Sequence, residues 1–274
     1  MAEGKERAAD KNIASDALDV SIVVPVYRNA ETLRELHDRL CRVLESQSLS
    51  FEILFINDAC PADSMSRLCE LASLDGRVGV IGLERNVGQH RAVMTGLVHA
   101  RGSWAVLMDA DLQDRPEIIP ALLEQGSKGF SAVFAGRRGQ YESRSRLLTS
   151  ALFKRLLHSL CGVPVDAGLF VALDRKMVQR LLEMACERPH VTAIIGCTKL
   201  PCVSIPVRRE TRPHGSSAYT FWKRLKSGCR AVRWVIGWKL QNVRGLKKAA
   251  PGEASANHYP ASVLPGTSRN LTKN

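Results

Sequence analysis

Residues 20–27 read Val-Ser-Ile-Val-Val-Pro-Val-Tyr, a β-branched run that predicts a buried strand. Similar runs predict further strands at 51–57, 78–83, 104–109 and 132–135. Helices are predicted between them at about 31–46, 62–74 and 89–100, and another begins near Pro116, a favoured first-turn residue. Strands that alternate with helices in this way are typical of a mostly parallel sheet with helices on both faces. The sequence therefore predicts an α/β fold with a Rossmann-like sheet.

The chain has 274 residues, enough for one α/β domain with tails. We expect a disordered N-terminal tail at 1–18, the domain at 19–218, a basic amphipathic helix at 219–248 and a disordered C-terminal tail at 249–274. No signal peptide and no transmembrane helix are predicted, since the apolar runs are short. None of the eight cysteines lies in a Cys-x-x-Cys pair or completes a zinc pattern with histidines, so we expect reduced cysteines in a cytosolic protein.

Met-Asp-Ala-Asp-Leu-Gln-Asp, at 108–114, follows the fourth predicted strand. Two carboxylates two residues apart at a strand end suit a hard divalent cation, Mg²⁺ or Mn²⁺, which also binds phosphate oxygens. The alternative is a solvated acidic loop that caps the helix at Pro116. The glycine-rich phosphate loops of dinucleotide enzymes and P-loop NTPases are absent from the sequence. If this sheet binds a nucleotide, it is expected to do so with carboxylates and a metal.

Four motifs occur in the order and spacing of the family-2 glycosyltransferases: Val23-Val24-Pro25-Val26-Tyr27, Ile56-Asn57-Asp58, Arg85-Asn86-Val87-Gly88-Gln89-His90 and Asp109-Ala110-Asp111-Leu112-Gln113. Over about residues 20–225 the chain most resembles the polyprenyl-phosphate sugar synthase branch, such as dolichyl-phosphate mannose synthases. The resemblance implies a GT-A fold and an inverting, metal-dependent sugar transfer.

The resemblance also implies the roles of individual residues. It places Pro25, Tyr27 and Asp58 around the base and ribose of the nucleotide-sugar donor, and Asp109 near the nucleotide. It places Asp111 and Gln113 on the metal and the diphosphate. The loop with Asn86, Gly88 and Gln89 is expected beside the donor. Both Pro25 and Tyr27 have structural alternatives: Pro25 as the residue that ends a strand, and Tyr27 as a half-buried packing residue.

Arginines are implied at the phosphates, where a guanidinium fork suits phosphate oxygens. Arg137 and Arg212 are the residues expected at the acceptor phosphate and the donor diphosphate. Two alternatives remain for Arg138, Arg144 and Arg146: they bind phosphate with Arg137 and Arg212, or they lie on a solvent-exposed surface. Asp166-Ala167-Gly168-Leu169-Phe170 resembles the element that shapes the floor of the acceptor site.

The chain departs from the family pattern at several positions. Asn57-Asp58-Ala59-Cys60 stands where many relatives read Asp-Asp-Gly-Ser, and Asn29 stands where relatives often have Glu. No Glu-Asp pair occurs near 185–200, where relatives that use a hydroxyl acceptor keep their general base. A phosphate acceptor is already ionised and needs no base, so this departure favours a lipid phosphate.

The net charge of +12 lies almost entirely in residues 208–248, where twelve Lys and Arg face one acid, Glu210. An apolar stripe with helical spacing runs through this segment: Trp222, Leu225, Cys229, Val232, Ile236, Leu240 and Val243. Basic residues beside such a stripe are typical of a helix in a membrane interface. A helix packed on the domain is the alternative, and nucleic-acid binding is not expected because no nucleic-acid motif accompanies the charge.

The sequence thus predicts a glycosyltransferase that moves a hexose from a UDP- or GDP-sugar to a polyprenyl phosphate. It is expected to be cytoplasmic and peripherally bound to the inner face of the membrane. Two alternatives remain: transfer to a hydroxyl of a polysaccharide or small molecule, and a degenerate scaffold without activity.

Overall fold

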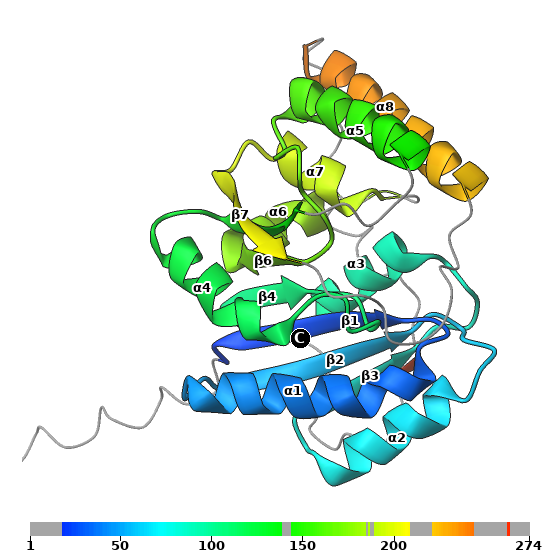
Figure 1. The fold of residues 1–274 in the computed structure, drawn as a ribbon, viewed down its shortest axis with the longest axis vertical. Helices are drawn as coiled ribbons and strands as arrows, with labels where there is room; N and C mark the ends of the chain where they lie inside the picture. The colour runs from blue at the N-terminus through cyan, green and yellow to red at the C-terminus, as the bar shows by residue number, and fades with distance from the viewer. Residues whose placement is uncertain are drawn as a thin grey trace, which may run out of the picture.

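A computed structural model describes residues 18–138, 144–184, 186, 189–208, 221–243 and 262–263. For residues 137–138, 144–152, 221–227, 241–243 and 262–263 it describes the backbone. The strands within these ranges form one sheet in the order β7-β5-β6-β4-β1-β2-β3-β8 (Figure 1). Their bounds are β1 Val20–Val26, β2 Phe51–Asn57, β3 Val78–Gly82, β4 Trp104–Leu107, β5 Ala132–Arg138, β6 Val171–Asp174, β7 Cys202–Arg208 and β8 Ser262–Val263.

The central strands β4, β1, β2 and β3 pair in parallel, as the alternation of strands and helices predicted. β6, β7 and β8 were not predicted. β6 is four residues long and inserts antiparallel between β4 and β5, while β7 extends the sheet parallel to β5. The predicted α/β fold with a mostly parallel sheet is therefore confirmed, and the second half of the chain adds its antiparallel strand.

Helices cover both faces of the sheet (Figure 1). The helices and short 3-10 helices are η1 Ala30–Thr32, α1 Leu33–Ser46, α2 Ser64–Leu74, α3 Gln89–His99, η2 Pro116–Ile118, α4 Ile119–Ser127, α5 Arg144–Cys161, α6 Arg175–Glu183, α7 Val191–Cys197 and α8 Phe221–Val243. Side chains of α1, α2 and α4 pack on one face with alternate strand residues such as Ile22, Val24 and Phe55. Side chains of α3, α5, α6, α7 and α8 pack on the other face with Val23 and Ile56. Alternation along each strand thus supplies two separate cores.

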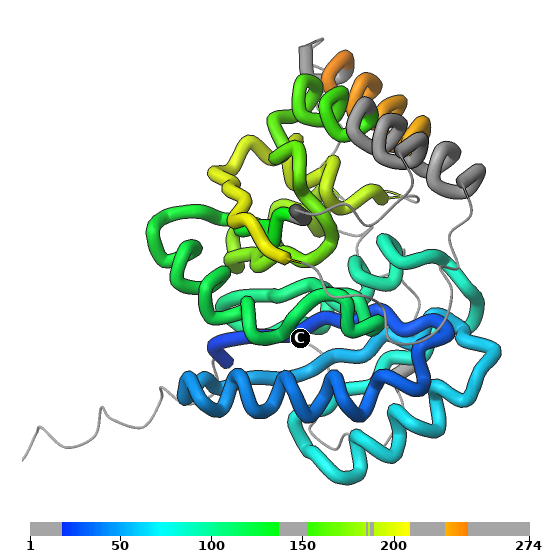
Figure 2. Tube along the Cα trace, in the orientation of Figure 1, coloured from blue at the N-terminus to red at the C-terminus, as the bar shows by residue number. Residues whose placement is uncertain are grey.

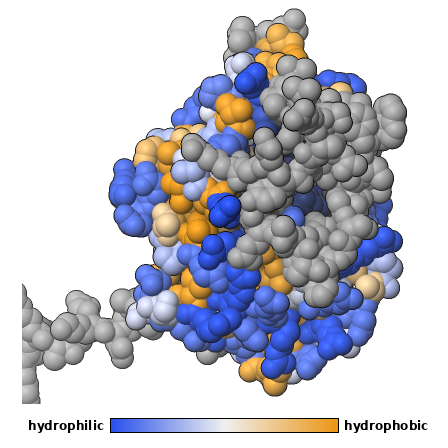
Figure 3. Space-filling model, viewed as in Figure 1, coloured by the Kyte–Doolittle hydropathy of each residue, from blue (hydrophilic) through white to orange (hydrophobic). Residues whose placement is uncertain are grey.

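α8 lies alongside α5, and the chain path in Figure 2 shows the pair at one end of the molecule. α8 packs inward through Gly228, Ala231 and Val235, whose exposure is low. Of the predicted apolar stripe, Ile236 and Leu240 are 43% and 53% exposed. Hydrophobic residues are visible on the surface at this end in Figure 3. Val232 of the stripe also packs against the core, so the helix packs on the domain with part of its apolar stripe and leaves Ile236 and Leu240 outward. In the described part of the chain, no helix combines the length and apolar content needed to cross a bilayer.

A buried carboxylate fixes the edge of the sheet where the parallel strands begin. Glu52, on β2, is 5% exposed and accepts hydrogen bonds from the Ser21 hydroxyl at 2.7 Å and the Arg101 backbone N–H at 2.9 Å. The Arg101 guanidinium donates to its other oxygen at 2.7 Å. These contacts join β1, β2 and the connection into β4, so they hold the strands that position the opposite edge.

We expect Glu52→Ala to lower the free energy of unfolding by about 2 kcal/mol, because it leaves buried donors without their acceptor. Glu124→Ala, at an exposed ion pair with Lys128 on α4, is the matched control and should change stability by less than about 0.5 kcal/mol. Urea unfolding followed by circular dichroism measures both. Equal effects of the two substitutions would show that Glu52 is not an anchor.

Candidate active site

The loops that follow β1, β2, β3 and β4 meet at one edge of the sheet. These four strands are parallel neighbours, so their carboxyl ends lie together, and open α/β sheets bind ligands outside such ends. Asp58 follows β2, Asn86 to Gln89 follow β3, and Asp109 and Asp111 follow β4. The structure therefore brings together the donor-side and metal-side residues that the sequence singled out.

Asp58 is buried and holds the loop after β3. One carboxylate oxygen accepts from the backbone N–H of Val87 at 2.7 Å, and the other from that of Gly88 at 2.9 Å. The Asn86 side chain donates to the Asp58 carbonyl at 3.2 Å. Burial raises the pKa of Asp58, while the two N–H groups oppose that rise by stabilising the charged form. Asp58 thus shapes the loop that precedes α3.

The start of α3 faces the loop after β4. Gly88 is the N-cap of α3, with φ at 87°, a conformation that glycine adopts without strain. The side-chain amide of Gln89, the first residue of α3, donates to the carboxylate of Asp109. A helix N-terminus favours negative charge, so α3 presents a favourable environment for an anion beside Asp109.

The turn that carries Asp111 is folded inward. Ala110 and Leu112 are each 2% exposed and Asp111 is 5% exposed. The Thr32 hydroxyl donates to the Ala110 carbonyl at 2.5 Å, and the Gln113 backbone N–H donates to Asp111 Oδ1 at 3.1 Å. These contacts hold the carboxylate of Asp111 and the backbone of Gln113 in one short turn.

Three of these loops contain a residue other than glycine in the left-handed region. Arg28 follows β1 with φ at 61°, Ala59 follows β2 with φ at 46°, and Leu112 follows β4 with φ at 59°. Each such residue costs about 1–2 kcal/mol, and such residues cluster at functional sites where the surrounding structure holds them. Asn57 supports one of them, because its side-chain oxygen accepts from the Cys60 N–H at 3.0 Å across Ala59.

The donor set fits a hard divalent cation. Asp109, Asp111 and Gln113 offer oxygen atoms within one turn, and oxygen ligands are those that Mg²⁺ and Mn²⁺ prefer. The alternative reading of this motif, a solvated loop that caps a helix, does not match the burial of Asp111. The residue before Pro116, Arg115, caps η2 without a side-chain hydrogen bond.

Pro25 and Tyr27 lie on and just after β1. Pro25 is buried within the strand and pairs with Ile56, and Tyr27 is half-buried at the edge where the loops meet. The guanidinium of Arg28 lies 5.4 Å from the centre of the Tyr27 ring. Tyr27 is therefore near the expected place of a donor base, and its binding role stays a prediction.

His90 connects the donor side to α7. Its ring lies 4.4 Å from that of His190, and its Nδ1 accepts from the Val191 backbone N–H at 3.4 Å. Burial lowers the pKa of His190 to about 4 and that of His90 well below its usual value, with His190 adding to the effect on His90. Both shifts favour the neutral rings, and the Nδ1 of His90 is engaged by the Val191 N–H. No sequence pattern indicates that His190 would meet it.

The structure describes only some of the arginines that are expected at the phosphates. The backbone of Arg137 lies on β5, and the side chains of Asp166 and Ser204 lie so close to its neighbour Gly136 that a side chain there would displace them. The Asp166 side chain therefore lies beside β5, next to the backbone of Arg137, and a shared acceptor site stays a prediction. Arg212 lies outside the described residues, as do the side chains of Arg137, Arg138, Arg144 and Arg146.

Thr32 is a site residue that sequence reasoning missed. Its hydroxyl supports the turn that carries Asp111, yet a threonine at a helix start does not reveal a partner 78 residues away.

Comparison with known proteins identifies a family and several relatives of this chain. Residues 21–200 match the family described as Glycosyl transferase family 2. An uncharacterized glycosyltransferase, YkcC of Bacillus subtilis, is 32% identical over 212 residues, which are 76% of this chain and 66% of that protein. An undecaprenyl-phosphate 4-deoxy-4-formamido-L-arabinose transferase of Enterobacter sp. is 33% identical over 207 residues, 74% of this chain and 63% of that protein. The chain thus spans slightly less than two thirds of the length of these relatives.

Solved structures share the fold. A mannosyltransferase of Pyrobaculum calidifontis, in complex with GDP-Man and Mn²⁺, has a TM-score of 0.60 at 16% identity, over 88% of this chain and 68% of that one. A glucosyl-3-phosphoglycerate synthase of Mycobacterium tuberculosis, in complex with Mn²⁺, UDP and glucosyl-3-phosphoglycerate, has a TM-score of 0.53 at 19% identity, over 90% and 88%. The sheet and its helices have the GT-A fold of glycosyltransferases, and the chain belongs to glycosyl transferase family 2.

Proposed function

We propose that this glycosyltransferase moves a hexose from a nucleotide sugar to a polyprenyl phosphate at the inner face of a membrane, with inversion at the anomeric carbon. The proposal rests first on the turn that carries Asp111. That buried turn lies beside the N-terminus of α3 and the loop held by Asp58, at the edge where parallel strands end. An arrangement of carboxylates beside a helix N-terminus suits a nucleoside diphosphate and its cation.

Each residue has a defined part in the proposed reaction. Asp111 and Gln113 would hold Mg²⁺ or Mn²⁺, which offsets the charge that develops on the leaving nucleoside diphosphate. Gln89 orients Asp109 through its side-chain amide, and Asp58 keeps the Val87–Gly88 backbone in place beside the donor. Arg137 and Arg212 are proposed to bind the phosphate oxygens of the acceptor and donor. The acceptor phosphate attacks the anomeric carbon from the side opposite the departing diphosphate.

Two observations favour a lipid phosphate over a hydroxyl acceptor. The first is the lack of a Glu-Asp pair near 185–200, since an ionised phosphate needs no general base. The second is the outward face of α8, where Ile236 and Leu240 are exposed next to the exposed side chains of Arg230 and Arg233. Apolar and cationic side chains together on one helix suit an anionic membrane surface. The name of the Enterobacter relative, which specifies undecaprenyl phosphate, agrees with this choice.

We expect Asp111→Asn to lower the rate of sugar transfer by about 10²- to 10³-fold, the effect of losing one group that stabilises the departing charge. Its Mn²⁺-dependent affinity for UDP or GDP should fall as well. Glu124→Gln, an exposed carboxylate on α4, is the matched control and should leave both unchanged. Calorimetric titration with and without Mn²⁺ gives the affinities. Unchanged transfer by Asp111→Asn would contradict the proposed role of this turn.

We expect the double substitution Ile236→Asp and Leu240→Asp to weaken binding to anionic lipid vesicles by about tenfold or more, because it removes exposed apolar area and adds repulsion. Metal-dependent affinity for the nucleotide should stay the same. Leu74→Asp, which alters a 65% exposed leucine on α2, is the control and should keep vesicle binding. Vesicle co-sedimentation measures the effect, and equal binding by all three proteins would rule out α8 as the membrane contact.

A further inference from the structure

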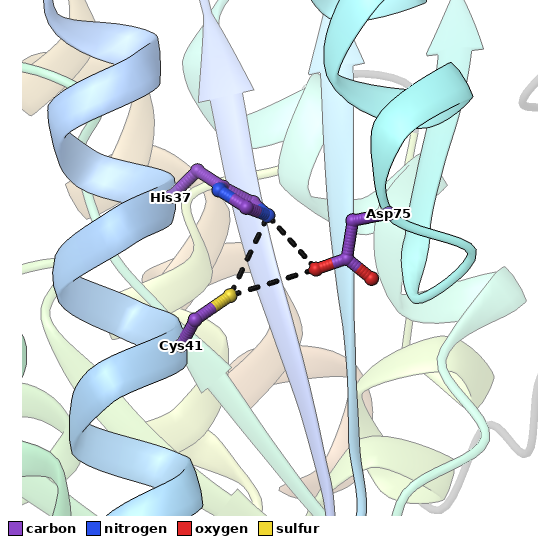
Figure 4. A group of neighbouring side chains, drawn as sticks. All are labelled: His37, Cys41 and Asp75. Carbon is purple, nitrogen blue, oxygen red and sulfur yellow. Dashed lines mark hydrogen bonds and ion pairs between the residues drawn. The ribbon is translucent and has the colours of Figure 1, made fainter.

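A second group of metal-ligating side chains lies away from the candidate active site. His37 and Cys41 are one turn apart on α1, and Asp75 is the residue that ends α2 before β3 (Figure 4). We call these three residues the His37 cluster. Their ligand atoms point toward one another across the gap between α1 and the α2–β3 turn. The sequence showed no zinc pattern because Asp75 is far from the other two in the chain.

The distances within the cluster match those of a tetrahedral metal site. His37 Nε2 lies 3.0 Å from Asp75 Oδ2 and 3.4 Å from Cys41 Sγ, and Cys41 Sγ lies 3.6 Å from Asp75 Oδ2. Bonds of about 2.0–2.3 Å from zinc to N, O and S atoms place neighbouring ligand atoms about 3.3–3.6 Å apart. The three atoms therefore need shifts of only a few tenths of an ångström to bind one ion.

The ligand set selects zinc rather than the cation proposed for the active site. An imidazole nitrogen, a sulfur and a carboxylate oxygen suit Zn²⁺, whereas Mg²⁺ and Mn²⁺ prefer oxygen alone. Cys41 is 8% exposed, and the side chains of His37 and Asp75 are 13% and 12% exposed. The site is thus enclosed on the Cys41 side and open to solvent at its other two ligands, where a water molecule can complete the coordination.

The neighbours of the cluster orient its ligands. His37 Nδ1 lies 3.1 Å from the Asp38 carboxylate, the partner that a metal-bound histidine commonly has. Asp75 Oδ1 accepts from the Arg77 backbone N–H and from its Nε, both at 2.9 Å. Asp75 Oδ2 faces His37 Nε2 and also accepts from Arg77 Nη2 at 2.9 Å, so an ion bound at Oδ2 takes the place of that guanidinium contact. Glu45 holds the far end of the Arg77 guanidinium at 2.7 Å.

The local charge favours a cation. Apart from His37, the ion pairs around the cluster join four carboxylates and two guanidinium groups, a formal charge of −2: Asp38, Glu45, Glu70, Asp75, Arg34 and Arg77. Burial raises the pKa of the Cys41 thiol to about 12, and Arg77 Nη2, which lies 3.6 Å from Cys41 Sγ, opposes that rise. A divalent ion bound by one thiolate and one carboxylate fits this environment.

We propose that His37, Cys41 and Asp75 form a Zn²⁺ site that fastens α1 to the α2–β3 turn. Zinc binds His37 Nε2, Asp75 Oδ2 and the Cys41 sulfur, and the proton of the Cys41 thiol leaves to solvent as the sulfur–metal bond forms. The site is independent of the proposed sugar transfer, since it shares no ligand with the turn that carries Asp111.

Titration with Co²⁺, a spectroscopic substitute for Zn²⁺, tests the site in the full chain after removal of metals. We expect one equivalent of Co²⁺ to give a thiolate-to-cobalt charge-transfer band that Zn²⁺ abolishes. Cys41→Ser and His37→Gln should lose the band and bind one Zn²⁺ fewer per chain. Cys69→Ser, at an exposed cysteine on α2, is the matched control and should keep both. Asp38→Asn should weaken Zn²⁺ binding about 10- to 100-fold.

X-ray absorption of the zinc-loaded wild-type protein gives the ligands directly, so the test holds even where a variant fails to fold. One sulfur with nitrogen and oxygen ligands is the expected result. Any of three results would overturn the proposal. The first is a zinc shell of nitrogen and oxygen alone, and the second is the lack of a charge-transfer band in the wild-type protein. The third is a band that the folded Cys41→Ser variant retains.

Discussion

The parallel pairing of β4, β1, β2 and β3 is the constraint on which the rest of the structure depends. It places four connecting loops at one edge, and the connections return to the other edge through helices on both faces. The buried Glu52 network fixes the edge where the strands begin, so the edge where they end is held in register. Asp58, Asp109 and Asp111 come together because they follow β2 and β4, two strands that flank β1.

The loops at that edge depend on local polar contacts and on backbone strain. Asp58 fastens the loop after β3, and Thr32 reaches from the start of α1 to the turn that carries Asp111. Ala59 adopts a left-handed conformation where many relatives are expected to have glycine, so this turn carries a cost in backbone energy. Such strain persists only where neighbouring contacts hold it, and Asn57 supplies one of them.

Much of the fold could be predicted from the sequence, because buried parallel strands are short β-branched runs with helices between them. The bounds of β1 and β2 agree with those runs to within a residue. β6 and β7 were not predicted, because the alternation of strand and helix ends after β5, and the antiparallel place of β6 depends on β4 and β5. The grouping of the acidic motifs followed from the strand ends. The contacts of Thr32, the pairing of His90 with His190 and the His37 cluster did not, because each joins residues through tertiary packing alone.

α8 shows how a sequence pattern and a packing face can differ. The apolar stripe was apparent from its spacing, yet the helix packs on the domain through Gly228, Ala231 and Val235. Gly228 and Ala231 are small, so α8 can approach α5 closely. The Phe153 ring on α5 lies where a side chain at position 228 would otherwise be. The larger apolar residues Ile236 and Leu240 are left for a surface outside the domain, which gives the proposed lipid acceptor a physical basis.

The most direct test of the central claim is transfer of label from radiolabelled UDP- and GDP-sugars into butanol-extractable lipid, with polyprenyl phosphate added and with either Mn²⁺ or EDTA present. The account predicts that one donor labels the lipid phase, only with the metal and only with the lipid phosphate. Label that enters a water-soluble sugar acceptor in place of the lipid, or lipid labelling that EDTA leaves unchanged, would contradict it.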